Sequence, residues 1–151
     1  MGTIQHSIWI RAAPSIVWDV YTDLDRIPAW QTGDPRVVEV TGRGDEVGTT
    51  YIVRRGAGAA RTTVTEAVRP ELHRSRTKAY FGLSFELTAK LLPERSGTKI
   101  LLEAQTHWPK GLGLLGQVVE FAVLNAREAN RELERLRVLV ESEAADESPR
   151  H

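Results

Sequence analysis

The sequence contains no cysteine and has no excess of charge of either sign. Among its 151 residues, 20 are basic and 20 are acidic, so the formal net charge is +0 at pH 7. The absence of cysteine excludes disulfide bonds, thiolate metal ligands and a cysteine nucleophile. A chain without a basic excess has little to attract phosphate backbones, so we expect no nucleic-acid partner.

Long apolar stretches are also absent. No run approaches the ~20 residues that a membrane-spanning helix needs. The first residues, MGTIQHSIWIR, do not form a basic segment followed by an apolar one, so we expect no signal peptide. A soluble, cytoplasmic protein is the resulting prediction. Only four of the 20 basic residues are lysine, and this preference for arginine favours a bacterial source.

Hydrophobic periodicity predicts helices and strands in the first 33 residues. Apolar and polar residues alternate over 4–10, which indicates a strand with one buried face. Pro14 fits the first turn of a helix, and apolar residues at helical spacing follow it. Pro28 interrupts that pattern, which predicts a second short helix ending near Trp30.

The middle of the chain reads as strands joined by tight turns. Six segments have strand character: RVVEV, TTYIVRR, ARTTVTEAV, LHRSRTKAY, LSFELTAKLL and TKILLEAQTHW. Parallel strands need long crossovers, so these short connections predict an antiparallel meander. With the first strand, the sheet has about seven strands.

The last part of the chain is predicted to be one long helix over about 116–142. An apolar stripe runs along it at helical spacing, formed by Val119, Ala122, Ala126, Ala129, Leu133, Leu136 and Val140. The segment RELERLR carries like charges at i, i+4 spacing and reads as a solvated face. We expect one domain over 1–143 and a disordered tail over 144–151, because the tail lacks apolar residues beyond alanine.

One arrangement buries all these elements: the sheet curls, and the long helix lies across its concave face. Residues 8–30, IWIRAAPSIVWDVYTDLDRIPAW, contain a strand, the helix start AP..VW, and then D and P.W. Gly48 before the third strand, TVTEAVRPELH and SGTKI follow. In order and spacing, over about 3–142, these motifs resemble the START-like superfamily, also called SRPBCC or helix-grip proteins. Bacterial polyketide cyclase/dehydrase-type members are the most similar.

The resemblance implies an α+β helix-grip fold with a seven-stranded curved antiparallel sheet, two short helices and a long C-terminal helix. It also implies a deep apolar cavity between sheet and helix that binds a lipid-, polyketide- or quinone-like molecule, without a metal or a tightly bound cofactor. Strand alternation and helical spacing give the expected lining of a pocket of roughly 300–1,000 Å³: Trp30, Tyr51, Val53, Phe85, Leu102, Phe121 and Asn125.

Trp30 has two interpretations. By resemblance it lies at the edge of the cradle formed by the two short helices, near the cavity mouth. Alternatively, it only packs this cradle onto the long helix, since tryptophan buries a large apolar area.

The segment GLGLLG, residues 111–116, matches the pattern of a dinucleotide-binding loop. No strand follows the next helix, so no βαβ unit can form, and we exclude nucleotide binding. The segment is either an apolar cap over the cavity or a simple chain reversal.

The candidates for catalysis are Tyr51, Arg55 and His6. If Tyr51 faces inward, alternation sends Arg55 the same way, and aromatic polyketide cyclases use arginine and hydroxyl groups to polarise substrate oxygens. Alternatively, Arg55 reaches solvent and pairs with Glu66. His6 shares the apolar face of its strand and is either a satisfied core residue or a polar group in the cavity.

Two functions follow from this sequence. The first is non-catalytic binding or transport of a small hydrophobic molecule. The alternative is an enzyme that cyclises or dehydrates an aromatic polyketide-like substrate by acid–base chemistry. A protein-interaction module is a weaker third possibility.

Overall fold

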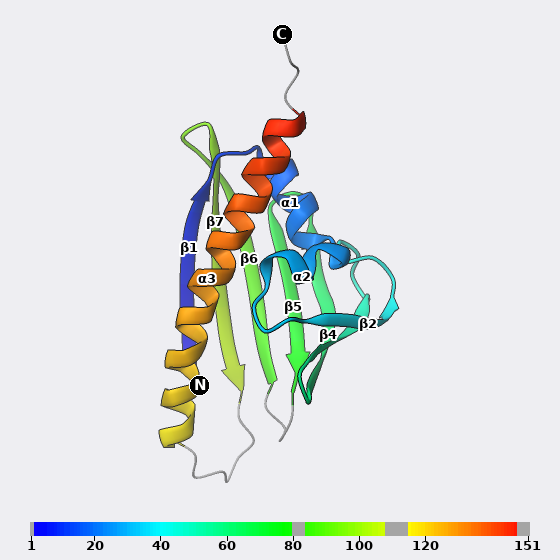
Figure 1. Cartoon of the computed structure of the whole chain (residues 1–151), viewed down its shortest axis with the longest axis vertical. Helices are drawn as coiled ribbons and strands as arrows, with labels where there is room; N and C mark the ends of the chain where they lie inside the picture. Colours follow the sequence, from blue (N-terminus) through cyan, green and yellow to red (C-terminus); the bar gives the residue numbers. More distant parts are fainter. Residues whose placement is uncertain (1, 80–83, 108–114, 148–151) are drawn as a thin grey trace.

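The computed structural model describes residues 2–79, 84–107 and 115–147, and of residues 115–126 and 147 it describes the backbone only. Within these residues, seven strands form one sheet, and helices cover one of its faces (Figure 1). The elements are β1 (Gly2–Ile10), α1 (Pro14–Thr22), η1 (Leu24–Arg26), α2 (Ile27–Trp30), β2 (Arg36–Thr41), β3 (Thr50–Arg55), β4 (Gly58–Val68), β5 (Leu72–Lys78), β6 (Ser84–Glu94), β7 (Gly97–His107) and α3 (Leu115–Glu147).

Local sequence accounts for the starts of the short helices. Pro14 opens α1 and Pro28 lies in the first turn of α2, where a missing backbone N–H has no cost because it would have no helical partner. The carboxylate of Asp23 accepts a hydrogen bond from the backbone N–H of Asp25 at 3.0 Å and so caps η1. Both predicted short helices, including the one that ends at Trp30, are confirmed.

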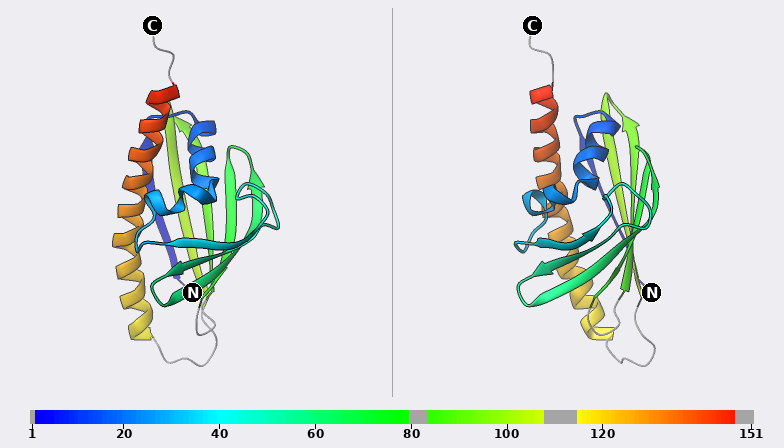
Figure 2. Two further views of the ribbon diagram at one scale, coloured as in Figure 1. Left: turned by 45° about the vertical axis from the view of Figure 1, so that its right-hand side comes forward. Right: turned by 90° about the vertical axis from the view of Figure 1, so that its right-hand side faces the viewer.

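The sheet is antiparallel throughout, with strand order β1-β7-β6-β5-β4-β3-β2. It curves around the helices, and α3 runs along its concave side next to β1 (Figure 2). α3 also contacts α1 and α2. The predicted α+β helix-grip fold is therefore confirmed.

Strand register places specific side chains on the concave face, because directly paired residues in an antiparallel sheet point to the same side. One row crosses β3, β4, β5, β6 and β7. Its members are Tyr51, Thr62, Thr77, Phe85 and Thr106. The next rows toward the other end of the sheet include Leu87 with Ala104 and Ile4, and then Ala89 with Leu102 and His6. The predicted common faces within β1, β6 and β7 are thus confirmed.

The hydrophobic core fills only one end of this face. There Ile10, Ala89, Leu91 and Ile100 are fully buried, together with Val17 and Trp18 of α1 and Leu133, Leu136 and Val140 of α3. The C-terminal part of the predicted apolar stripe on the long helix is therefore buried in this core.

The long helix extends further than the sequence prediction. It ends at Glu147 rather than near Ser142, so the expected tail from 144 onward begins inside the helix. Ala144 packs against the core, which shows that alanine at the right helical position is enough to continue the buried stripe. Residues 148–151 and 108–114, which include the first four residues of the GLGLLG motif, lie outside the described residues, as do the side chains of Phe121 and Asn125.

Candidate functional site

The concave face is not uniformly buried. Phe85, Leu87, Leu102 and Ala104 point to the same side as the core residues, yet each is only half-buried, whereas Leu91 on the same face is 2% exposed. Apolar side chains on the inside of a folded sheet normally lose almost all contact with water. Solvent therefore reaches the concave face at the end away from the packed core.

A row of hydroxyl groups crosses the same end of the sheet, although its two threonines are buried. Thr62 and Thr77 are 6% and 8% exposed, and their hydroxyl oxygens are 2.8 Å apart. Tyr51 lies directly opposite Thr62 on β3. Burial raises the pKa of the Tyr51 phenol, while a side-chain hydrogen bond with Thr62 and the charge of Arg55 oppose that shift. We call Tyr51, Thr62 and Thr77 the hydroxyl row; it offers uncharged hydrogen-bonding groups on an otherwise apolar surface.

Trp30 lies beside this face, within the hydrophobic core. It is 5% exposed and stacks on Tyr21, with ring centroids 5.8 Å apart and an angle of 29° between the planes. Burial, with Tyr51 and Glu132 acting in the same direction, raises the pKa of Tyr21 far above its usual value. Trp30 thus packs the cradle, as its structural interpretation expects. Its indole Nε1, however, has no hydrogen-bond partner among the described residues.

The structure overturns the expected partner of Arg55. Arg55 is exposed, donates from Nε to the carbonyl oxygen of Thr32 at 3.1 Å, and hydrogen-bonds the side-chain oxygen of Gln31. Glu66 instead pairs with Arg74 at 2.9 Å. The β3–β4 register explains the difference, because Gly58 lies opposite Arg55 and Glu66 sits toward the far end of β4.

Glu132 is the residue of this region that sequence reasoning missed. It is half-buried on α3, and its Oε1 accepts from the backbone N–H of Thr32 at 3.1 Å and from the Thr32 hydroxyl at 3.0 Å. Burial raises the pKa of this carboxyl in spite of those two hydrogen bonds and the charge of Arg55. The interpretation of RELERLR as a solvated face holds for Glu134 but is wrong for Glu132.

Thr32 therefore connects α3 to the edge of the sheet. Its N–H and hydroxyl bind Glu132, and its carbonyl oxygen accepts from Arg55 of β3. We call Glu132, Thr32 and Arg55 the polar bridge. No sequence pattern predicted the polar bridge, because Thr32 and Glu132 are 100 positions apart in the chain.

The three candidates for catalysis do not form one group. Tyr51 and Arg55 lie on the same side of β3, and Arg55 is exposed. His6 lies on the concave face of β1, with the four strands β7, β6, β5 and β4 between it and β3. The Nε2 atom of His6 has no hydrogen-bond partner among the described residues.

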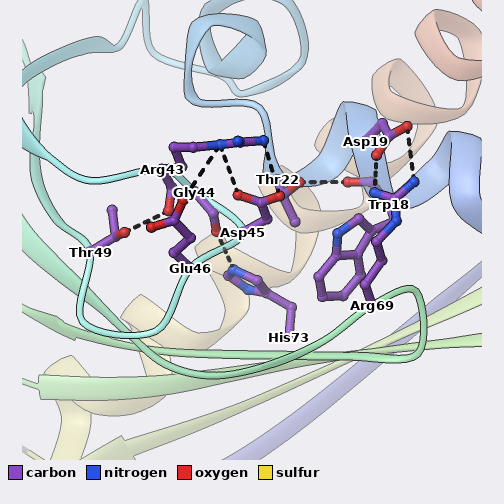
Figure 3. Close-up of polar contacts among 10 residues, drawn as sticks. All are labelled: Trp18, Asp19, Thr22, Arg43, Gly44, Asp45, Glu46, Thr49, Arg69 and His73. Carbon is purple, nitrogen blue, oxygen red and sulfur yellow. Dashed lines mark hydrogen bonds and ion pairs between the residues drawn. The ribbon is translucent and has the colours of Figure 1, made fainter.

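A separate open pocket of about 630 Å³ lies outside the concave face, between α1, η1 and the loop before β3. Its walls are acidic, but arginines pair with several of the carboxylates: Arg43 with Asp45, and Arg69 with Asp19 (Figure 3). Because these carboxylates are engaged in ion pairs, the pocket is not a free anionic site. The described residues contain no group of His, Asp and Glu side chains that could hold a metal ion. None of the described helices combines the length and apolar character needed to cross a membrane.

Comparison with known families assigns the chain. Residues 1–141 match the family described as "Polyketide cyclase / dehydrase and lipid transport". The chain belongs to this family. No curated protein sequence matches it.

Solved structures share the fold of this family member at low sequence identity. Protein CV1439 of Chromobacterium violaceum is 20% identical, with a TM-score of 0.68, and the match covers 93% of this chain and 99% of that one. Protein MLL2253 of Mesorhizobium loti is 16% identical, with a TM-score of 0.73 and coverage of 93% and 98%. Norcoclaurine synthase of Thalictrum flavum, solved as a point mutant with a transition-state analogue, is 17% identical, with a TM-score of 0.71 and coverage of 94% and 95%.

Proposed function

We propose that this protein binds a small, largely apolar molecule, of the polyketide, lipid or quinone type, between the concave face of the sheet and α3. The observation that carries the proposal is the half-exposed apolar surface at one end of that face, with Phe85 and Leu87 among its members. Covering such surface contributes roughly 25 cal/mol for each Å² of apolar area removed from water. The family description supports the same class of ligand.

The expected contacts combine apolar and polar groups. Val53, Phe85 and Leu102 supply apolar surface, Tyr51 supplies a hydroxyl group, and Trp30 closes the site from α2. Phe121 and Asn125 remain predicted contacts from α3. Few polar groups on a mainly apolar wall are typical of sites that bind small molecules.

A matched pair of leucine variants tests this proposal. Leu87 and Leu92 lie on the same strand, but Leu87 is on the concave face and Leu92 is 46% exposed on the other side. The probe is N-phenyl-1-naphthylamine, an uncharged fluorophore. We expect Leu87→Ala to weaken probe binding about tenfold, on the scale of one lost apolar side-chain contact, and Leu92→Ala to leave it unchanged.

Native mass spectrometry of the purified protein should complement the titration by detecting a co-purified ligand. Circular dichroism must first show that both leucine variants fold. Equal probe affinity in the two variants, or no binding of the probe to the wild-type protein, would contradict the proposal.

A Trp30→Phe variant tests whether the indole N–H of Trp30 contacts the ligand or the residue only packs the cradle. The substitution keeps an aromatic ring against Tyr21 but removes the unpartnered indole N–H. If that N–H donates to the ligand, binding of an oxygen-bearing ligand weakens while the melting temperature changes little. Unchanged affinity together with a lower melting temperature would leave Trp30 with a packing role alone.

Catalysis of cyclisation or dehydration is a second candidate, favoured by one specific observation. The pKa of the Glu132 carboxyl is raised. The charges of Glu132 and Tyr51 both contribute to the raised pKa of Tyr21. A carboxyl group whose pKa is raised toward neutrality can transfer protons in both directions. Glu132→Gln should then abolish the dehydration of a β-hydroxyketone, which is measured by the absorbance of the enone product. The affinity for the fluorescent probe should persist. Retained turnover would remove Glu132 from the chemistry.

A further inference from the structure

The charges near the proposed site are unevenly distributed. The fixed cation of the concave face, Arg55, already uses its guanidinium for Thr32 and Gln31. Burial lowers the pKa of His73, which keeps this imidazole neutral near pH 7, and its Nε2 is 2.8 Å from the carbonyl oxygen of Gly44. His6 is the remaining basic side chain of this face among the described residues; it lies on β1 opposite Leu102, with four strands between it and Tyr51 of β3.

Two of the segments without described side chains add no positive charge to this balance. Residues 115–126, the first part of α3, read LGQVVEFAVLNA and contain no lysine, arginine or histidine. Residues 80–83, YFGL, contain none either, whereas residues 108–114, WPKGLGL, include one lysine, Lys110, and the end of the chain carries Arg150 and His151. A bound anion would therefore find few groups able to neutralise it.

A negative charge, in contrast, is close to the site. Glu132 extends from α3 to Thr32, and its charge acts on Tyr21, the ring on which Trp30 stacks. Both hydrogen bonds from Thr32 reach Oε1 of Glu132. A second carboxylate placed nearby would be repelled strongly, because the surroundings are partly shielded from water.

The neutral polar groups favour a different kind of ligand. The hydroxyls of Tyr51, Thr62 and Thr77 can donate or accept, and the indole N–H of Trp30 is a buried donor without a partner. A buried donor is stabilised when it meets an acceptor such as a carbonyl or hydroxyl oxygen.

We infer that the bound molecule carries an uncharged oxygen-bearing polar group, a hydroxyl or a carbonyl, and that the site rejects carboxylates. This inference rests on the proposed function and narrows it. It favours alcohols, ketones and quinones over free fatty acids. The physical reason is that a buried anion is stable only beside a partner cation, and the described residues here offer a carboxylate instead.

The experiment compares three ligands with the same alkyl chain: 1-decanol, decanoate and decylamine. Each displaces N-phenyl-1-naphthylamine from the full chain at pH 8, where decanoate is ionised. We expect decanol to displace the probe at a concentration at least tenfold lower than decanoate, a difference of about 1.4 kcal/mol.

Ionised decanoate is also better hydrated than decanol, so a protein variant must isolate the contribution of Glu132. Glu132→Gln keeps an oxygen that can accept from Thr32 and should reduce the decanol preference severalfold. The control is Glu128→Gln, one turn earlier on the same helix and exposed to solvent, which changes the net charge equally and should leave the preference nearly intact.

The outcomes separate this inference from the proposed function. Decanoate that competes as well as decanol, or a preference that Glu132→Gln does not alter, overturns the inference and leaves ligand binding standing. Decylamine that binds more tightly than decanol also overturns it, in favour of an amine ligand. Failure of the wild-type protein to bind the probe contradicts ligand binding itself.

Discussion

At the scale of single residues, His73 is an ionisable group enclosed by aromatic rings. Its ring meets Trp18 and Tyr21 edge-on, at centroid distances of 5.7 and 5.6 Å, and its Nε2 hydrogen-bonds the carbonyl oxygen of Gly44. Its Nδ1 has no partner among the described residues. The neutral imidazole of His73 thus packs between β5 and the loop before β3.

The lowered pKa of His73 predicts a pH-dependent stability. The unfolded chain binds this proton more readily than the folded one, so the free energy of unfolding decreases as pH falls below about 6.5, the usual value for histidine. We expect thermal melts between pH 8 and 5 to show a smaller loss for His73→Phe than for the wild-type protein. Parallel curves for the two proteins would contradict this assignment.

Glu132 should behave in the opposite sense. Its pKa is raised in the folded state, so ionisation opposes folding, and its stability contribution is complete at low pH and lost as pH rises through the folded pKa. Glu132→Gln should therefore be more stable than the wild-type protein at pH 7, with a gain that shrinks as pH falls toward 4.5. Chemical unfolding at both pH values measures this, and Glu132→Ala, which removes the acceptor for Thr32, should show no such gain.

At the scale of elements, the loop between β2 and β3 depends on one glycine. A Cβ on Gly44 would lie 1.9 Å from the carbonyl oxygen of Thr22, at the end of α1. Figure 3 shows this loop folded against Thr22 and His73. The close approach lets the loop pack directly on α1, and only glycine permits it.

Gly44→Ala should consequently lower the free energy of unfolding by about 3 kcal/mol, because the backbone of either the loop or α1 must shift. Gly56 provides the control: it also lies in a turn, and a Cβ there would meet nothing within 4 Å. Gly56→Ala, at a φ of +57°, should cost only about 1 kcal/mol. Equal denaturation midpoints for the two variants would contradict the close-packing argument.

The two faces of α3 give a second comparison at this scale. Leu136 is fully buried in the core, whereas Val138, two residues later, is 58% exposed. Leu136→Ala should cost about 2–5 kcal/mol through lost burial and a cavity, and Val138→Ala less than about 0.5 kcal/mol. A similar effect of both substitutions on thermal unfolding would show that the stripe is assigned to the wrong face.

Sequence patterns were sufficient for the elements and insufficient for the contacts between them. Alternation, prolines and tight turns are local signals, and they located the strands, both short helices and the faces of Tyr51 and Phe85. The polar bridge depends on how the loop after Trp30 meets α3, which no local pattern encodes. Arg55 illustrates the limit: its face was predictable, but its partner was set by hairpin register and by the position of Gln31.

At the scale of the whole molecule, the balance of charge has a consequence for handling the protein. With 20 basic and 20 acidic residues, the formal net charge is +0 at pH 7. Proteins without net charge repel one another least and associate most readily. We expect solubility to be lowest near neutral pH and to rise by pH 8.5, as measured by turbidity of concentrated samples across this range; a flat profile would contradict the prediction.

The polar bridge also gives the molecule an internal reporter. Thr32 lies in a short connection between α2 and β2, where backbone amides normally exchange their hydrogens with water quickly. Its N–H is instead held by Glu132 from a helix 100 residues away, so deuterium should enter it slowly. The exchange rate at this single amide would follow the opening and closing of α3 against the sheet, even before any ligand is known.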